Sequence, residues 1–107
     1  MRAVELMNIL KKLNIPVTNT EFPSNKKVKP PFVVFLRSNI DSFDADNVVY
    51  KHDYRYFIEL YTENKDENME DKLISLLNDN EILWSYVSDS RIEKGLYIMV
   101  LSIWKLI

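Results

Sequence analysis

His52 and Asp53 form the pair of neighbouring residues in this 107-residue chain that comes nearest to a catalytic arrangement. His52 is the only histidine, and an imidazole beside a carboxylate can act as a general base. No serine or further carboxylate stands at a spacing that completes such a set. The chain has no cysteine, which excludes thiol catalysis, disulfides and zinc–thiolate sites. We therefore predict neither an enzyme nor a cofactor.

Three aspartates, Asp41, Asp44 and Asp46, are close enough in sequence to suggest a calcium loop. A twelve-residue calcium loop also needs a central glycine and a terminal glutamate, and this segment has neither. Asp, Asn and Ser are typical of solvated turns, so a polar loop over residues 38–47 is the stronger interpretation. No metal site is predicted.

Lys26, Lys27 and Lys29 lie in a proline-rich stretch, residues 23–31, that has no helical or strand periodicity. Such a basic loop can contact phosphate or an acidic protein surface, although a soluble loop is the commoner reason for lysines there. Gly95 is the only glycine, so no phosphate-binding glycine loop exists.

Composition predicts one globular domain, with 47% hydrophobic and 28% charged residues. A net charge of −2 gives no bulk electrostatic reason to bind nucleic acid, and sequence-specific binding to it is not predicted. The first ten residues include Glu5 and Asn8 and lack the apolar core of a signal peptide. No apolar run is long enough to span a membrane. A cytosolic compartment fits these features.

The hydrophobic pattern alternates between helical and strand periods along the chain. Helices are expected at Arg2–Leu13 and Asp66–Asn78. Strands are expected at Val17–Phe22, Phe32–Arg37, Val48–Thr62, Ile82–Ile92 and Leu96–Leu106. This order predicts an α+β fold, with a mainly antiparallel sheet of four to five strands and both helices packed on one face. It lacks the strand–helix alternation of parallel nucleotide-binding folds.

Side-chain spacing predicts which residues share a face of the long aromatic strand and of the second helix. In the strand at Val48–Thr62, one face carries Tyr54, Tyr56, Ile58 and Leu60, and the other carries Phe57 and Tyr61. The second helix has one apolar stripe, made of Met69, Leu73, Leu76 and Leu77. Glu93, Lys94 and Gly95 are expected to form a three-residue hairpin between the last two strands.

The last strand is apolar on both of its faces. Leu96, Ile98, Val100, Trp104 and Leu106 lie on one face; Tyr97, Met99, Leu101, Ile103 and Ile107 lie on the other. Two short helices can cover only one face of such a sheet. The second face is therefore either a subunit interface, or part of a curved sheet that covers itself, or a surface beneath the loop at residues 23–31.

The stretch from Asp46 to Leu77 resembles a known family, and the resemblance continues through Trp84 and the region of Ile92, Glu93, Leu96 and Tyr97, so that it covers roughly the last three quarters of the chain. The runs ADN, VVY and YRYFIELYTENKDENMEDKL resemble small tail-terminator or head–tail joining proteins, also described as minor capsid or tail-completion proteins, of tailed phages and prophages of Gram-positive bacteria. In these proteins a tyrosine-rich strand leads through a "KD" turn into an acidic helix. The matching residues are Asp46, Asn47, Tyr50, Tyr56, Ile58, Glu59, Leu60, Tyr61, Thr62, Lys65, Asp66 and Glu70.

This resemblance implies a structural role in virion assembly. Copies would form a ring, hexameric by analogy, that caps the tail tube and joins it to the head; the partners would be the tail-tube and head-completion proteins. It places the protein in the virion, and in the host bacterial cytoplasm during assembly. It favours a subunit interface at Tyr97, Met99, Leu101, Ile103 and Trp104. It also favours partner contacts at Lys26, Lys27, Lys29, Asp41, Asp44 and Asp46.

A different class of function remains open from the aromatic residues alone. The chain has 12% aromatic residues, and such side chains can line a ligand pocket or anchor an interface. A pocket lined by Tyr54, Tyr56 and Trp84 would indicate a small non-enzymatic interaction or ligand-binding module. An aromatic sheet core is the simpler use of the same residues.

Overall fold

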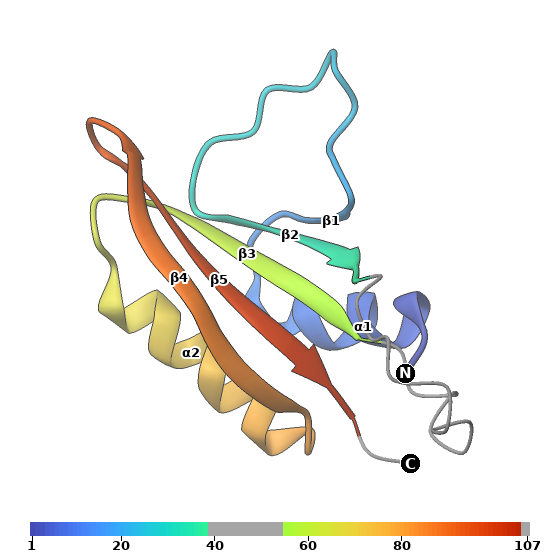
Figure 1. Ribbon diagram of the computed structural model, residues 1–107. Helices are drawn as coiled ribbons and strands as arrows, with labels where there is room; N and C mark the ends of the chain where they lie inside the picture. The colour runs from blue at the N-terminus through green and yellow to red at the C-terminus, as the bar shows by residue number, and fades with distance from the viewer. Residues whose placement is uncertain (39–54, 106–107) are drawn as a thin grey trace.

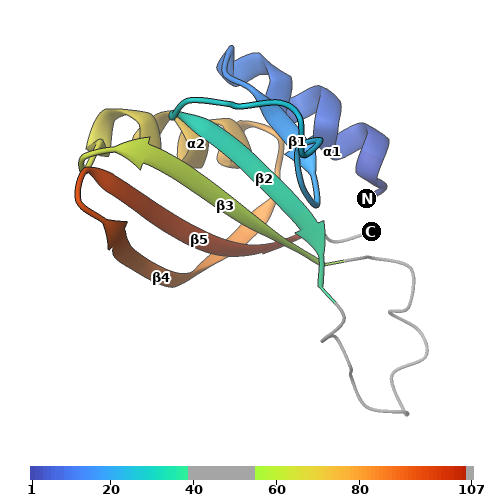
Figure 2. The ribbon, with the colours of Figure 1, turned by 90° about the horizontal axis from the view of Figure 1, so that it is seen from above.

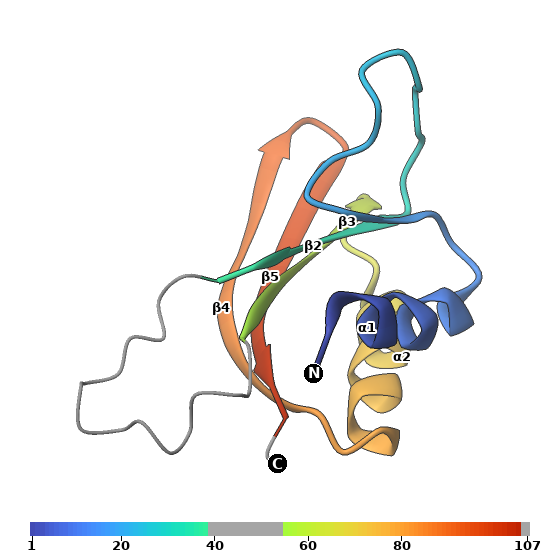
Figure 3. The ribbon, with the colours of Figure 1, turned by 90° about the vertical axis from the view of Figure 1, so that its right-hand side faces the viewer.

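The computed structural model describes residues 1–38 and 55–105, which form a five-stranded sheet with two α-helices on one face (Figures 1 and 3). The elements, in chain order, are α1 (Ala3–Leu10), the short 3₁₀ helix η1 (Lys11–Leu13), β1 (Val17–Asn19), β2 (Phe32–Arg37), β3 (Tyr56–Glu63), α2 (Glu67–Asp79), β4 (Leu83–Glu93) and β5 (Leu96–Trp104). The strand order is β1-β2-β3-β5-β4 (Figure 2). Only β1 and β2 are parallel to each other, so the predicted α+β fold with a mainly antiparallel sheet is confirmed.

The predicted apolar stripe of α2 is buried or partly buried, and α1 also buries one side. In α1 the buried residues are Leu6, Ile9 and Leu10, and in α2 they are Leu73 and Leu77. The start of α2 is fixed by Asp66, whose Oδ1 accepts a hydrogen bond from the backbone N–H of Met69 at 3.1 Å. This cap satisfies an amide that the first turn of a helix leaves unpaired.

The core lies between the helices and the central strands β2, β3 and β5. Residues of the three strands alternate between buried and partly exposed, as the period of two predicts. The pairing register places Leu60 of β3 between Val33 of β2 and Met99 of β5, and Ile58 between Phe35 and Leu101. Each of these rows contributes three side chains to one continuous core.

Several element boundaries differ from the predicted ones. The strand β1 ends at Asn19 instead of Phe22, because Thr20 has a positive φ of 76° that takes the chain out of the extended conformation. The turn between β4 and β5 has two residues, not three, since Glu93 already pairs with Leu96. Gly95 adopts a φ of +81° in this turn, as a glycine is best able to do.

Part of the predicted aromatic strand lies outside the described residues. Within them, β3 begins at Tyr56 and extends one residue beyond Thr62. The expectations for residues 39–54 therefore have no structural counterpart here. They concern Asp41, Asp44, Asp46, His52, Asp53 and Tyr54.

Candidate functional site: the open face and the outer strand

The face of the sheet opposite the two helices is here called the open face, because no helix of the described residues covers it (Figure 3). It consists of side chains from the three central strands: Phe32, Val34, Leu36, Phe57, Glu59, Tyr61, Ile98, Val100, Ser102 and Trp104. All are at least partly buried, since neighbouring side chains cover one another. The open face is therefore an apolar layer with limited exposure.

Aromatic contacts account for much of this mutual cover. The rings of Phe32 and Tyr61 stack with centroids 4.7 Å apart, and the ring of Phe22 meets Phe32 edge-on at 5.5 Å. At the other end of the face, the guanidinium of Arg55 lies 4.5 Å from the centre of the Trp104 ring. Such ring and cation–π contacts each stabilise by roughly 0.5–1.5 kcal/mol.

A single carboxylate, that of Glu59, lies in the middle of the open face. Its register partners are Val34 on one side and Val100 on the other. The hydroxyl of Tyr61 donates a hydrogen bond to Glu59 Oε1 at 2.9 Å. Burial, together with this hydrogen bond and the negative charge of Glu59, raises the pKa of Tyr61 to about 12.

The outer strand β4 differs from the central strands in having no buried residue. Five large apolar side chains are exposed in the described residues, and four of them belong to β4; these four are 40–57% exposed. They are Leu83, Tyr86, Val87 and Ile92. The concentration of exposed apolar surface in one edge strand is unusual, because edge strands normally protect themselves with charge or proline.

Two irregularities in the pairing of β4 with β5 explain part of this exposure. The register shifts between Tyr86 and Ser88, and again between Arg91 and Glu93. Val87 and Ile92 are the residues passed over by these shifts, so neither has a direct partner on β5. An extra residue of this kind bends a strand and changes the direction of its side chains.

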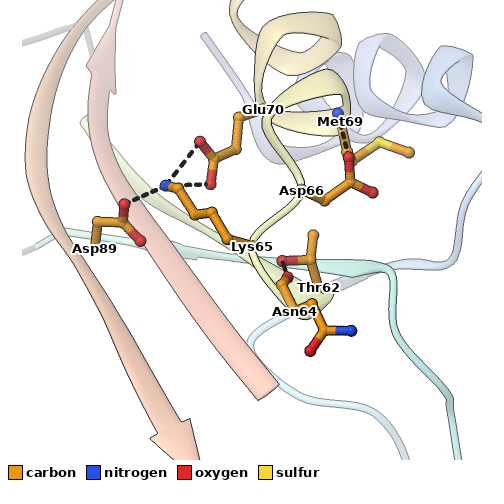
Figure 4. A network of polar contacts seen from close by, with 7 residues as sticks. All are labelled: Thr62, Asn64, Lys65, Asp66, Met69, Glu70 and Asp89. Carbon is orange, nitrogen blue, oxygen red and sulfur yellow. Dashed lines mark hydrogen bonds and ion pairs between the residues drawn. The ribbon is translucent and has the colours of Figure 1, made fainter. Parts of the chain in front are cut away.

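On the helix side, β4 is held by an ionic network (Figure 4). Lys65, in the turn between β3 and α2, binds Glu70 of α2 at 2.8 Å and also binds Asp89 of β4. These hydrogen bonds, with Asp89 first and Glu70 second, raise the pKa of Lys65 above its usual range. The same turn is fixed to the hairpin because the N–H of Asn64 donates to the carbonyl oxygen of Gly95 at 2.9 Å.

The structure corrects the predicted interface on β5. Met99, Leu101 and Ile103 are buried in the chain's own core beneath the helices, so their side chains are not exposed to a second molecule. Tyr97 is on the same face and is partly buried. Trp104 points to the opposite face, where it contacts Arg55. The five predicted interface residues therefore do not form one surface.

The aromatic residues expected to line a pocket have structural roles. Tyr56 is buried, and its hydroxyl donates to the carbonyl oxygen of Met1 at 3.2 Å. Trp84 is hydrogen-bonded through Nε1 to Asn78 Oδ1 at 3.0 Å. Ile103 lies between them in the pairing register. A shallow depression of the surface lies elsewhere, between η1 and α2, and includes neither aromatic residue.

The lysines of the predicted basic loop are exposed. Lys26, Lys27 and Lys29 lie in the long connection between β1 and β2, which projects from one end of the sheet (Figure 1). Among the described residues they form no ion pair. Their charges are therefore available to a partner.

Residues 1–38 and 55–105 contain no group of three or more histidine, cysteine, aspartate or glutamate side chains arranged to hold a metal ion. No helix in this part of the chain is long and apolar enough to cross a membrane. Comparison of the chain with protein-family models and with curated proteins finds no match.

Proposed function

We propose that the chain is a structural component of a tailed phage or prophage virion, acting as a tail terminator or as a head–tail connector. Copies associate side by side into a ring, which has six subunits by analogy with the family that the sequence resembles. One side of the ring caps the last layer of the tail tube, and the other side binds the head-completion protein. The proposal requires no cofactor and no catalytic step.

The observation that carries the proposal is the exposed apolar surface of β4. Four large side chains of one outer strand are 40–57% exposed, whereas the open face is mostly covered by its own aromatic rings. Removing such surface from water contributes about 25 cal/mol per Å². A strand with one free edge can also bind a partner through its backbone. Both properties favour a protein that works by association with other protein surfaces.

The family resemblance, which begins at Asp46 and extends to Tyr97, is the reason for proposing a ring in particular. It links the strand β3, the Lys65–Asp66 turn and the acidic start of α2 to proteins that work in rings. The exposed Lys26, Lys27 and Lys29 are suited to the role of a partner-contacting loop, because they form no ion pair among the described residues.

The first experiment is a measurement of mass in solution by light scattering over a concentration series, with negative-stain images of any large species. The same series is repeated with purified tail tubes as a template. Closed rings with a central opening, free or at the ends of the tubes, are the expected result. A monomer in every condition, with no binding to tube ends, contradicts the proposal. The neighbouring genes give an independent check, since terminase, portal and tail-tube genes are expected nearby.

A second candidate is a small interaction module that uses the aromatic open face. The Phe32–Tyr61 stack and the Arg55–Trp104 contact favour it, because aromatic and arginine side chains are the residues that most often anchor interfaces. The variants Phe57→Ala and Val87→Lys separate the two candidates. Loss of association in Val87→Lys alone supports the ring, and loss in Phe57→Ala alone supports the module.

A further inference from the structure

Charge is distributed unevenly between the two parts of the described chain. Residues 1–38 contain seven Lys and Arg against two Asp and Glu, a balance of +5. Residues 55–105 contain six Lys and Arg against ten Asp and Glu, a balance of −4. A net charge of −2 for the whole chain conceals this separation.

Because of the strand order, the positive and negative parts of the chain lie at opposite edges of the sheet. The positive part supplies β1 and β2 at one edge of the sheet, and the negative part supplies β3, β5 and the opposite edge strand β4 (Figure 2). Within the described residues, β1 and β4 each have a strand neighbour on one side only. The two free edges therefore lie on regions of opposite charge.

A basic segment and an acidic segment also lie at the same end of the sheet. The basic loop between β1 and β2 and the turn between β4 and β5 are at the same end of the molecule in both Figure 1 and Figure 3. Near that turn, Glu63, Glu67 and Glu93 are exposed, and within the described residues none of them forms an ion pair. They outnumber two basic residues at the same end of the hairpin, Lys94 in the turn and Arg91 on β4.

We propose that the basic loop of one copy, through Lys26, Lys27 and Lys29, docks against the β4 side of the next copy, near Glu63 and Glu93. The inference rests on the proposed function, because it names the contact through which the ring forms. The exposed Val87 and Ile92 supply the apolar part of the contact, and the charges fix its register. A contact that joins two different surfaces repeats head to tail and closes into a ring when its rotation permits.

The test is a charge exchange between two variants. The first variant, Lys26→Glu with Lys29→Glu, has an acidic loop; the second, Glu63→Lys with Glu93→Lys, has a basic β4 side. Each alone brings like charges together, and its association is expected to weaken at least about tenfold. Mixing the two in equal amounts restores attraction at every contact of an alternating ring. Recovery of the ring in the mixture is the decisive result.

A matched control separates the contact from general charge effects. Lys11→Glu with Lys12→Glu changes the net charge as much as the loop variant does, at exposed positions in η1. This control is expected to associate like the wild type. Circular dichroism and thermal unfolding of each variant confirm that it is folded. Association of the wild type is also expected to weaken as salt is added, because exposed charges are screened.

The outcomes distinguish failure of the contact from failure of the function. If the wild type forms rings and both charge-reversed variants do so equally well, the contact is elsewhere, and the proposed function is unaffected. If the wild type forms open chains that respond to the charge exchange, the contact is correct and the ring function is wrong. If the wild type does not associate even at low salt and with a template, both are wrong.

Discussion

The two strands of the β4–β5 hairpin pair along nearly their whole length, yet they face different environments. β5 places Met99, Leu101 and Ile103 in the core, whereas β4 has no buried residue. Composition separates them in part, because Ser102 is the one polar residue of β5, whereas β4 contains three serines and three charged residues. Position in the sheet adds to this difference, because β5 lies between β3 and β4 and only one side of β4 is paired.

This comparison shows that apolar residues in one hairpin can serve two purposes. On β5, Met99, Leu101 and Ile103 stabilise the folded chain, since they belong to the core beneath the helices. On β4, four large apolar side chains remain exposed, and the pairing irregularities at Val87 and Ile92 keep two of them away from β5. Substitutions in β5 are therefore expected to change stability, and substitutions in β4 to change association.

The largest effect is expected from a matched pair of substitutions across the hairpin. Leu101 and Tyr86 are direct register partners, but Leu101 is fully buried and Tyr86 is 57% exposed. Leu101→Ala is expected to lower the free energy of unfolding by about 2–5 kcal/mol, because it leaves a cavity. Tyr86→Ala is expected to cost less than about 1 kcal/mol. Urea unfolding measures both, and equal losses would contradict the division between the strands.

The next effect concerns association rather than stability. Val87→Lys is expected to weaken self-association at least about tenfold, because it places a charge in the proposed contact. Its free energy of unfolding should remain within about 0.5 kcal/mol of the wild type. Val4→Lys is the control, since Val4 is the exposed large apolar residue outside β4 in the described part of the chain. Light scattering compares the two, and equal behaviour would remove β4 from the interface.

The hairpin itself can be weakened without touching either set of apolar residues. Gly95→Ala is expected to cost about 1 kcal/mol, because its φ of +81° is unfavourable for a residue with a Cβ. No atom lies within 4 Å of the added Cβ, so the cost is conformational and not steric. Lys94→Ala in the same turn is the control. A neutral result for Gly95→Ala in thermal unfolding would mean that the turn relaxes.

A smaller effect is expected from the network that binds β4 to the helix layer. A double-mutant cycle of Lys65→Met and Asp89→Asn is expected to give a coupling of about 0.3–1 kcal/mol. The value is modest because Lys65 is 36% exposed and its charge is screened by solvent. The coupling should fall as salt is added. A coupling that does not respond to salt would indicate a packing contribution instead.

A further effect appears only at high pH and belongs to the open face. The pKa of Tyr61 is raised from its usual 10 to about 12 in the folded chain, so the unfolded chain loses this proton first. Stability contributed by the neutral hydroxyl is therefore present below pH 10 and lost as the pH rises towards 12. Unfolding of Tyr61→Phe should show less of this loss. Identical pH profiles would show that Tyr61 ionises normally.

Much of the fold followed from periodicity, and the missing part has a physical reason. Alternation in β3 and the stripe of α2 identified Ile58, Leu60, Leu73 and Leu77 as core residues, which is confirmed. The predicted end of β1 was wrong. The strand ends where Thr20 adopts a positive φ, and the sequence has no glycine there to indicate such a conformation. The pattern of residues 82–92 indicated a strand but not its place at the edge, since strand order depends on long-range pairing.

The interface was harder to predict than the fold. Two apolar faces on β5 correctly indicated that one face is not covered by helices, but the sequence of that strand does not say which one. The helices cover the face with Leu101 and Ile103, opposite to the prediction. The sequence did contain a sign that β4 is irregular. Val87 and Ile92 interrupt the alternation of apolar and polar residues along this strand, and both lie at its pairing irregularities.

The strand order also has a consequence for the way the protein is made. β4 precedes β5 in the chain, but β5 is the strand that joins β4 to β3. A ribosome therefore releases the exposed outer strand before the strand that anchors it to the sheet. During that interval β3 has no neighbour on one side, and the apolar residues of β4 are unattached. The sheet is completed only after β5 has left the exit tunnel, so β4 cannot join the sheet as soon as it is made.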